Sequence, residues 1–335
     1  MTISTTSPTA VSGGRKFDFV SFLEKYGVAL VLVLLIIFFT SQNERFLSVR
    51  NVTNILTEVS IYGIIAVGMT FVILTGGVDL AVGSLLAFAA MCAAVIIQAM
   101  GMSFALSWLV ALLVCCVVGG AAGLLHGVTI TRFNVPPFIV TLGGLTVWRG
   151  ATLILSGGGP ISGFDAGFRW WGRGQVLAIP VPVLVLLVVA ATGYVVATYT
   201  RYGRQVYAVG GNREAARLSG VNVNQILVSV YVIIGFLAGL SGFLLAARLG
   251  SAEAVAGTSY ELRVIAAVVI GGTSLFGGLG GVGGTIIGSM LLGVLLNGLV
   301  MIDVSAYYQQ VIIGVIIVLA VAFDTYAKSR HGGKK

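Results

Sequence analysis

Residues 59–83 read VSIYGIIAVGMTFVILTGGVDLAVG, and the part from 59 to 78 contains no Asp, Glu, Lys or Arg. A helix that spans a bilayer needs roughly 20 apolar residues, so this run is long enough for one crossing. The run then meets two adjacent glycines, Gly76 and Gly77, and the carboxylate of Asp79. The stretch therefore predicts a membrane helix that ends in a break.

The rest of the chain has the same character. It is 58% hydrophobic and 9% charged, whereas a soluble domain carries about 25% charged residues. Its apolar runs are continuous, as in LVLVLLIIFF at 30–39, while transmembrane barrel strands alternate over about ten residues. Because only helices and closed barrels satisfy backbone groups in lipid, the sequence predicts an all-α polytopic membrane protein with broken or re-entrant segments.

About ten spans fit the apolar pattern. Residues 1–25 are predicted to be a disordered tail, 26–325 the transmembrane domain and 326–335 a basic tail. Twelve of the 19 Lys and Arg fall on the side that holds both tails, which predicts that this side is cytoplasmic. The net charge of +8 is explained by this bias, and a nucleic-acid partner is not expected. The spans are expected near 26–41, 54–75, 84–100, 106–130, 138–155, 180–200, 226–248, 261–274, 282–301 and 307–325.

Two glycine-rich breaks, at 75–83 and 271–284, interrupt the apolar runs. Irregular backbone at membrane depth lies against protein or a water-filled cavity, so the breaks are candidates for a substrate path. Their similarity hints at an internal repeat. Within the first break, Asp79 is expected to cap the next helix near Gly83 and Ser84. A role in ion coupling is the alternative, although no partner is apparent. His126 is expected to be a packed, hydrogen-bonded core residue.

The chain shows no motif that would supply energy or catalysis. The phosphate-binding pattern GxxxxGK[ST] is absent, and no catalytic cluster or metal spacing is visible. The string GLGGVG at 278–283 matches a dinucleotide fingerprint, but no strand precedes it. These observations argue against a membrane enzyme.

The longest inner loop, 201–225, contains the segment NREAARLSG at 212–220. Asn212 suits a helix N-cap and Gly220 suits the position after the last turn. Ala215, Ala216 and Leu218 are expected to form a compact apolar face. A short amphipathic helix of this kind either docks on a protein surface or rests on the membrane surface, and the pattern leaves both open.

Five sequence segments, which follow one another along the chain, carry a resemblance to a known family. Together they make the chain resemble the membrane permeases of bacterial ATP-binding-cassette sugar importers of the ribose, xylose and galactose type, with the ribose permeases most similar. The resemblance covers residues 26–325. The segments are AVGMTFVILTGGVDLAVGSL at 66–85, VPPFIVTLG at 135–143, AVGGNREAARLSGV at 208–221, IAAVVIGGTSL at 265–275 and SAYYQ at 305–309.

The resemblance implies a homodimeric permease in the bacterial cytoplasmic (inner) membrane with both termini cytoplasmic. It also implies a cytoplasmic ATPase that binds ATP and Mg²⁺, a periplasmic or lipid-anchored sugar-binding protein, and no cofactor on the permease itself. The helix that couples the permease to the ATPase would comprise Asn212, Arg213, Glu214, Ala215, Ala216, Arg217, Leu218, Ser219 and Gly220.

The expected activity is inward transport of a ribose-like monosaccharide. Residues with polar side chains, which suit neutral sugars, are expected along the path: Thr70, Thr75, Asp79, Asn297, Gln309 and Gln310. The alternatives are a permease of this class for another pentose or hexose, a polyol or a branched-chain amino acid, and an ion-coupled secondary transporter. The sequence does not name the sugar.

Overall fold

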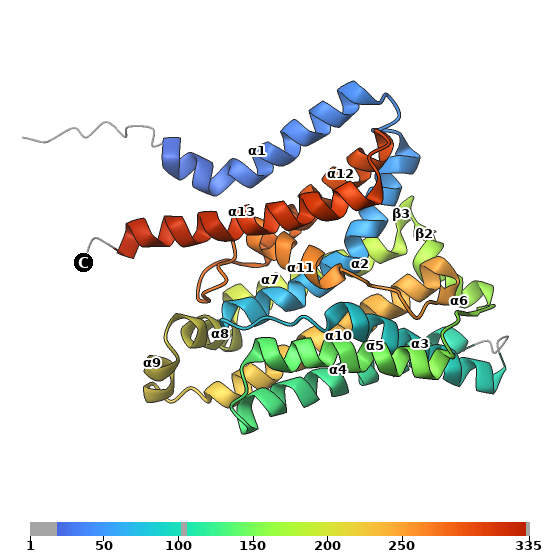
Figure 1. The fold of residues 1–335 in the computed structure, drawn as a ribbon, viewed down its shortest axis with the longest axis horizontal. Coiled ribbons are helices and arrows are strands. Elements are labelled where there is room, and N and C mark those ends of the chain that lie inside the picture. The colour runs from blue at the N-terminus through green and yellow to red at the C-terminus, as the bar shows by residue number, and fades with distance from the viewer. Residues whose placement is uncertain (1–18, 102–105, 333–335) are drawn as a thin grey trace, which may run out of the picture.

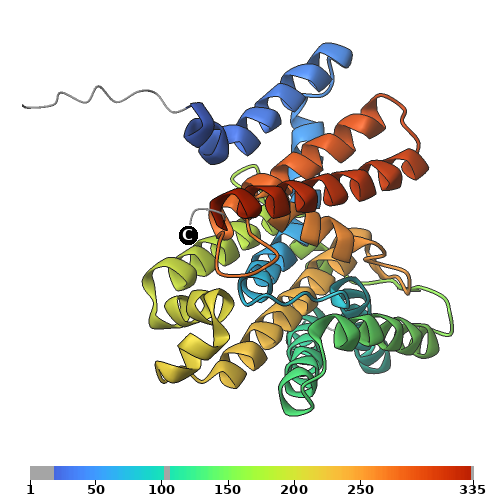
Figure 2. The ribbon, with the colours of Figure 1, turned by 60° about the vertical axis from the view of Figure 1, so that its left-hand side comes forward.

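The computed structural model describes residues 19–101 and 106–332, and this part of the chain is almost entirely helical. The long helices form a bundle (Figures 1 and 2). Each of the ten expected spans contains a helix. The helices are α1 (Phe19–Gln42), α2 (Val49–Leu74), α3 (Val82–Met100), α4 (Ser107–Arg132), α5 (Pro137–Ser156), α6 (Ala166–Arg173), α7 (Val181–Tyr199), α8 (Arg201–Gly211), α9 (Arg213–Leu218), α10 (Val223–Leu249), α11 (Tyr260–Ile270), α12 (Val282–Met301) and α13 (Ala306–Gly332).

The expected membrane character is confirmed. In the described residues, seven helices are long and apolar enough to cross a bilayer: α2, α3, α4, α5, α7, α10 and α12. Shorter apolar stretches, Gly27–Gln42 and Ala306–Leu319, lie within α1 and α13. The expected span at 261–274 is wrong as a full crossing, because the 11 residues of α11 extend only about 16 Å. That helix stops where its apolar run meets Gly271 and Gly272.

The boundaries of the two tails also differ from expectation. Helix α1 begins at Phe19, so residues 19–25, which were expected in the disordered tail, are helical. Residues 1–18 lie outside the described residues. Helix α13 continues to Gly332 and so takes in most of the expected basic tail, of which residues 333–335 lie outside the described residues.

Short elements distinguish the two ends of the bundle. One end carries α8 and α9, together with the first residues of α1 and the last residues of α13 (Figure 1). The other end, called here the outer end, carries α6 and two antiparallel strand pairs: β1 (Ile161–Ser162) with β4 (Ser251–Ala252), and β2 (Gln175–Val176) with β3 (Ile179–Pro180). The end with α8 and α9 is called the inner end.

Helix α2 forms the centre of the core. Its buried residues run from Ile55 to Leu74, and it packs against α7, α10, α11 and α12. A helix that is apolar on all sides must be covered on all sides, and the neighbouring helices provide that cover. Ser48 starts the helix by accepting a hydrogen bond from the backbone N–H of Asn51 at 3.4 Å. The residues that follow Leu74 leave the helix through Gly76, which has a φ of 76°.

The chain re-enters the bundle twice in non-helical form. Residues 75–81 lead from α2 to α3, and residues 250–259 lead from α10 to α11. The second segment meets the start of α3, where the backbone of Gly83 lies against that of Gly257. Helix α11 then begins beside Tyr62, near the midpoint of α2, where the Tyr62 and Tyr260 rings are 6.5 Å apart. The long helix, break and helix of the first half therefore recur in the second half.

This arrangement corrects the expected pairing of the breaks. The segment 271–281 is not the counterpart of 75–81, because it joins α11 to α12 at the inner end of the bundle. There the backbone N–H of Gly278 donates to Leu74 O at 2.9 Å, and the Tyr207 hydroxyl of α8 donates to Gly280 O at 2.8 Å. Glycine content alone does not reveal depth, because glycine serves tight surface loops and buried breaks equally well.

Candidate functional site

The inner end presents α9, the helix that the sequence predicted for docking. Asn212 caps it, since its Oδ1 accepts from the backbone N–H of Ala215 at 3.0 Å, and Gly220 has a φ of 84° just beyond its end. The helix itself runs from Arg213 to Leu218, a little shorter than the expected 212–220. The local capping residues therefore confirm a helix at this place.

The surface of α9 is charged and exposed. Glu214 Oε2 lies 2.9 Å from Arg217 Nη2, and both side chains are mostly exposed. Leu218 is 79% exposed. Of the apolar face that was expected, only Ala216 packs inward, while Ala215 lies at the surface. The three residues therefore do not act as one face in this structure, because Ala216 packs inward while Ala215 and Leu218 remain exposed.

Hydrogen bonds tie α9 to the end of α2 and α8 to the segment between α11 and α12. Arg213 Nη2 donates to Thr75 O at 3.2 Å, where the first re-entrant segment begins. Tyr207 donates to Gly280, and burial raises the pKa of its phenol, which keeps the hydroxyl protonated as a donor. Sequence analysis missed these links, because the motif around Arg213 does not indicate which carbonyl its side chain reaches.

The first re-entrant segment holds a buried polar chain. Asp79 Oδ1 accepts from the backbone N–H of Ala81 at 2.8 Å, and its Oδ2 lies 3.6 Å from His126 Nδ1. The Trp148 indole donates to His126 Nε2 at 3.0 Å. Because an indole N–H only donates, Nε2 is the accepting nitrogen of a neutral ring and Nδ1 carries the proton that faces Asp79.

Two expectations for this region change. Asp79 was expected to cap α3 near Gly83 and Ser84, but it accepts from Ala81 in the segment before the helix. His126 was expected to be a hydrogen-bonded core residue, which is confirmed, but its position beside Asp79 was not foreseen. Among the described residues, neither Asp79 Oδ2 nor His126 Nδ1 has a hydrogen-bond partner, and the two atoms face each other at 3.6 Å.

Replacing Asp79 by Ala is expected to destabilise the protein by about 1–3 kcal/mol, because the change leaves the buried N–H of Ala81 without its acceptor and removes the carboxylate that faces His126 Nδ1. The measurement is thermal unfolding of the purified protein in detergent. Glu44→Ala is the matched control, since it removes a carboxylate from the exposed loop between α1 and α2. Equal unfolding temperatures for the two variants would contradict the pairing.

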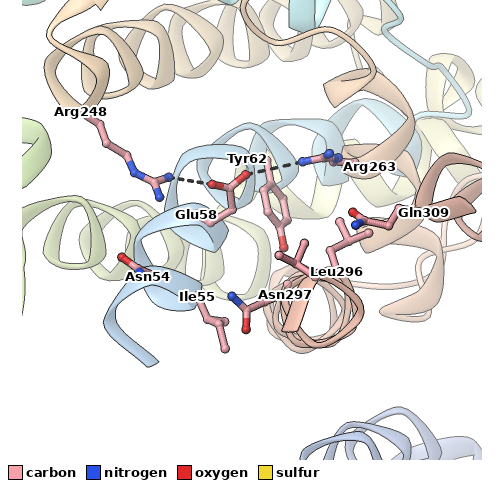
Figure 3. A pocket seen from close by; sticks show the side chains of 11 residues that line it. Asn54, Ile55, Glu58, Tyr62, Arg248, Arg263, Leu296, Asn297 and Gln309 are labelled. Atoms are coloured by element: carbon pink, nitrogen blue, oxygen red, sulfur yellow. Dashed lines mark hydrogen bonds and ion pairs between the residues drawn. The ribbon is translucent and has the colours of Figure 1, made fainter. Parts of the chain in front are cut away.

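A polar pocket opens at the outer end between α2, α10, α11, α12 and α13, with a volume of about 400 Å³ (Figure 3). Glu58 lies at its centre. The carboxylate Oε2 is 2.7 Å from Arg248 Nη1, and Oε1 is 3.6 Å from Arg263 Nη1. One carboxylate thus joins α2 to the end of α10 and to the first turn of α11. We call this space the outer pocket.

Three amide side chains complete the polar lining. Asn297 and Asn51 exchange two hydrogen bonds, at 2.8 and 3.0 Å, which join α12 to α2. Gln309 Nε2 donates to Val304 O at 3.1 Å, and Asn54 lies at the exposed edge. The pocket therefore combines carboxylate acceptors, guanidinium donors and amides that can serve as either.

The structure divides the six path residues that the sequence suggested. It brings Asn297 and Gln309 together in the outer pocket. Thr70 and Thr75 are buried, and their hydroxyls donate to backbone carbonyls of α2. The Thr70 hydroxyl also lies 2.7 Å from Thr285 Oγ1. Asp79 is buried beside His126, and Gln310 is exposed. Of the six, only Asn297 and Gln309 line the outer pocket.

Sequence analysis missed the three charged residues of the outer pocket. Glu58 directly precedes the charge-free run 59–78, and Arg248 and Arg263 flank the loop between α10 and α11. The position of Glu58 at the edge of such a run could have indicated a buried ion pair, because a charge close to membrane depth is usually paired. The sequence does not show which cations pair with it.

Comparison with known proteins supplies the last observation. Residues 51–321 match the family model described as "Branched-chain amino acid transport system / permease component". The chain is 43% identical over 318 residues to the ribose import permease protein RbsC of Escherichia coli (strain K12), covering 94% of this chain and 97% of the relative.

Two further relatives extend the comparison. The chain is 42% identical over 313 residues to the ribose import permease protein RbsC of Bacillus subtilis (strain 168), covering 92% of this chain and 95% of the relative. It is 38% identical over 325 residues to the D-allose transport system permease protein AlsC of Escherichia coli (strain K12), covering 97% and 98%. No solved structure matches.

Proposed function

The chain belongs to the family of permease components typified by the branched-chain amino acid transport system, and from that membership we propose that it imports a ribose-like monosaccharide as the permease subunit of an ATP-binding-cassette transporter. The observation that carries the proposal is the 43% identity to a ribose import permease over 94% of the chain. The subunit is not an enzyme and carries no cofactor of its own, and the family implies an ATPase and a binding protein as partners.

The ATPase would dock on α9. The exposed Glu214–Arg217 pair and the exposed Leu218 support this assignment, because a surface that joins a charged pair to a large apolar side chain suits protein contact. The links from Arg213 to Thr75 and from Tyr207 to Gly280 would carry the movement of the docked helix to the end of α2. The proposed coupling helix keeps the bounds 212–220, with its caps included.

The inner end would be cytoplasmic. This orientation agrees with the twelve Lys and Arg assigned to that side, and it places both termini there, where the described ends of α1 and α13 lie. Residues 26–325 would form the permease domain. We also propose a homodimer, in which the exposed apolar side chains of α5 and α13, such as Phe138, Ile154 and Val311, are available to meet a second copy or lipid.

Reconstitution tests the proposal. Proteoliposomes with the permease, its ATPase, internal ATP and the external binding protein are expected to accumulate D-ribose, whereas omission of the ATPase abolishes uptake. D-allose and D-galactose, presented with the same binding protein, define the sugar class. The mass of the purified complex gives the number of permease copies. Uptake that persists without the ATPase would refute the proposed function.

A further inference from the structure

We propose that the outer pocket binds the neutral monosaccharide during import, as the permease's own sugar site at its outer end. The inference rests on the proposed function, because it names where that function's substrate lies. It adds to that function a ligand site built by one permease chain, separate from the site of the binding protein.

The chemistry of the lining suits a sugar. Each hydroxyl of a sugar donates one hydrogen bond and accepts others, so its site must offer both kinds of group. The outer pocket offers the acceptors of Glu58, the donors of Arg248 and Arg263, and the amides of Asn54, Asn297 and Gln309. Its volume of about 400 Å³ falls within the roughly 300–1,000 Å³ of small-molecule sites.

Two of these side chains have an atom without a hydrogen-bond partner. Arg263 Nε is buried and, within the described part of the chain, has no hydrogen-bond partner. The Gln309 amide donates to Val304 O, while its Oε1 oxygen has no bond within the described part. The unpaired Arg263 Nε is costly because it is buried, and the half-buried Gln309 Oε1 is free to accept, so hydroxyls placed here would gain hydrogen bonds that the protein does not make by itself.

The charge distribution favours a neutral ligand over an anion. Both guanidiniums face Glu58, so a carboxylate already occupies the position that an anionic ligand would need. The remaining polar lining, the amides and the Tyr62 side chain, is uncharged. A negatively charged solute would meet the Glu58 carboxylate at close range, whereas a hydroxyl can donate to it.

The outer pocket is also accessible. A second cavity of about 710 Å³ shares Asn54 and Arg248 with it and extends to Arg173 of α6 and Gln175 of the β2–β3 hairpin. Because the two cavities share residues and the second is lined by α6 and by β2 and β3, both lie toward the outer end of the bundle. A sugar released at the outer surface would enter through the second cavity and reach Glu58 between α2, α10 and α11.

Protection of an introduced thiol tests this site directly. Cys92, Cys115 and Cys116 are first replaced by Ala, and Asn54→Cys is then introduced into the permease–ATPase complex in lipid nanodiscs. We expect D-ribose at tens of millimolar to slow modification by a polar maleimide at least threefold. Glu44→Cys, in the exposed loop outside the pocket, is the matched control and should react at the same rate with and without the sugar.

A transport assay gives the second measurement. The double variant Asn54→Ala with Gln309→Ala is expected to lower the D-ribose uptake rate about tenfold, as lost hydrogen bonds to substrate do, while ATPase stimulation by the loaded binding protein persists. Gln98→Ala, an exposed amide on α3, is the control.

Three results would overturn the inference: unchanged labelling of Asn54→Cys with D-ribose, full uptake by the double variant, or protection by D-gluconate but not by D-ribose. Failure of the proposed function has a different signature, namely uptake by the parent complex that does not require the ATPase.

Discussion

Permease in which both Glu214 and Arg217 are replaced by Ala is expected to lose D-ribose uptake by about 100-fold, because two exposed charges at the centre of the proposed docking surface would each contribute on the order of 1–2 kcal/mol to the contact. The permease itself should still fold. The Glu214–Arg217 pair is solvent-exposed, and pairs of this kind contribute about 0–1 kcal/mol to stability.

The measurement is uptake together with co-purification of the ATPase. Exchanging the two residues, Glu214→Arg with Arg217→Glu, restores an ion pair within α9 but reverses the charges that a partner meets. This exchanged variant should also fail to dock, which separates recognition from helix stability. Arg132→Ala, at the exposed end of α4, removes a different inner charge and should transport normally. Normal docking and uptake by the double Ala variant would show that the ATPase does not use this surface.

The reason for such a large effect lies in the connections of α9. The helix has six residues, too few to be stable alone, and it is held by the cap at Asn212 and by the bond from Arg213 to Thr75 O. Thr75 ends the central helix α2 and begins the first re-entrant segment. Movement of α9 by a docked ATPase would therefore be passed to the packed centre of the bundle. Such motions proceed as shifts of rigid packed elements.

Local signals in the sequence foretold much of this structure. The spans were predictable because a bilayer demands long apolar runs, and each run is visible without knowledge of its neighbours. Helix α9 was predictable for the same reason, since Asn212 and Gly220 act on backbone groups within a few residues. The short length of α11 was not predictable, because the residues after Gly271 remain uncharged although the helix has already ended there.

Contacts between segments that are distant in the chain could not be predicted from the sequence. Glu58 meets Arg248 and Arg263, and Asp79 meets His126, only because α2, α4, α10 and α11 pack in a particular register. For a related reason, polarity alone placed only two of the six suggested path residues in the outer pocket. A Thr hydroxyl in an apolar helix can donate to a carbonyl of its own turn, as Thr70 does to Ala66 O, and then has no proton left to donate to a substrate. The amides of Asn297 and Gln309 reach the outer pocket instead.

The crossing of α4 and α10 leads to the prediction with the second large effect. Gly119, Gly123 and Gly127 recur every four residues on one face of α4, and that face meets Gly235 and Gly239 of α10. An added Cβ at Gly123 would collide with the carbonyl of Tyr231, and one at Gly119 with the carbonyl of Gly235. Lipid is as apolar as Leu, so membrane helices associate mainly through close packing, which small residues permit.

Gly123→Val is therefore expected to destabilise the permease by about 3 kcal/mol or more, since overpacking against backbone cannot be relieved by a rotamer change. The measurements are the yield of monodisperse protein after extraction and its thermal unfolding temperature. Gly120→Val is the matched control, because it lies in the same helix and an added Cβ there meets nothing within 4 Å. The control also cancels the intrinsic effect of Val on the helix, so the difference between the variants reports the α4–α10 contact alone. Equal stability of the two would mean that the helices do not cross at these glycines, and the inward placement of His126 beside Asp79, which depends on the same face of α4, would then fail with it.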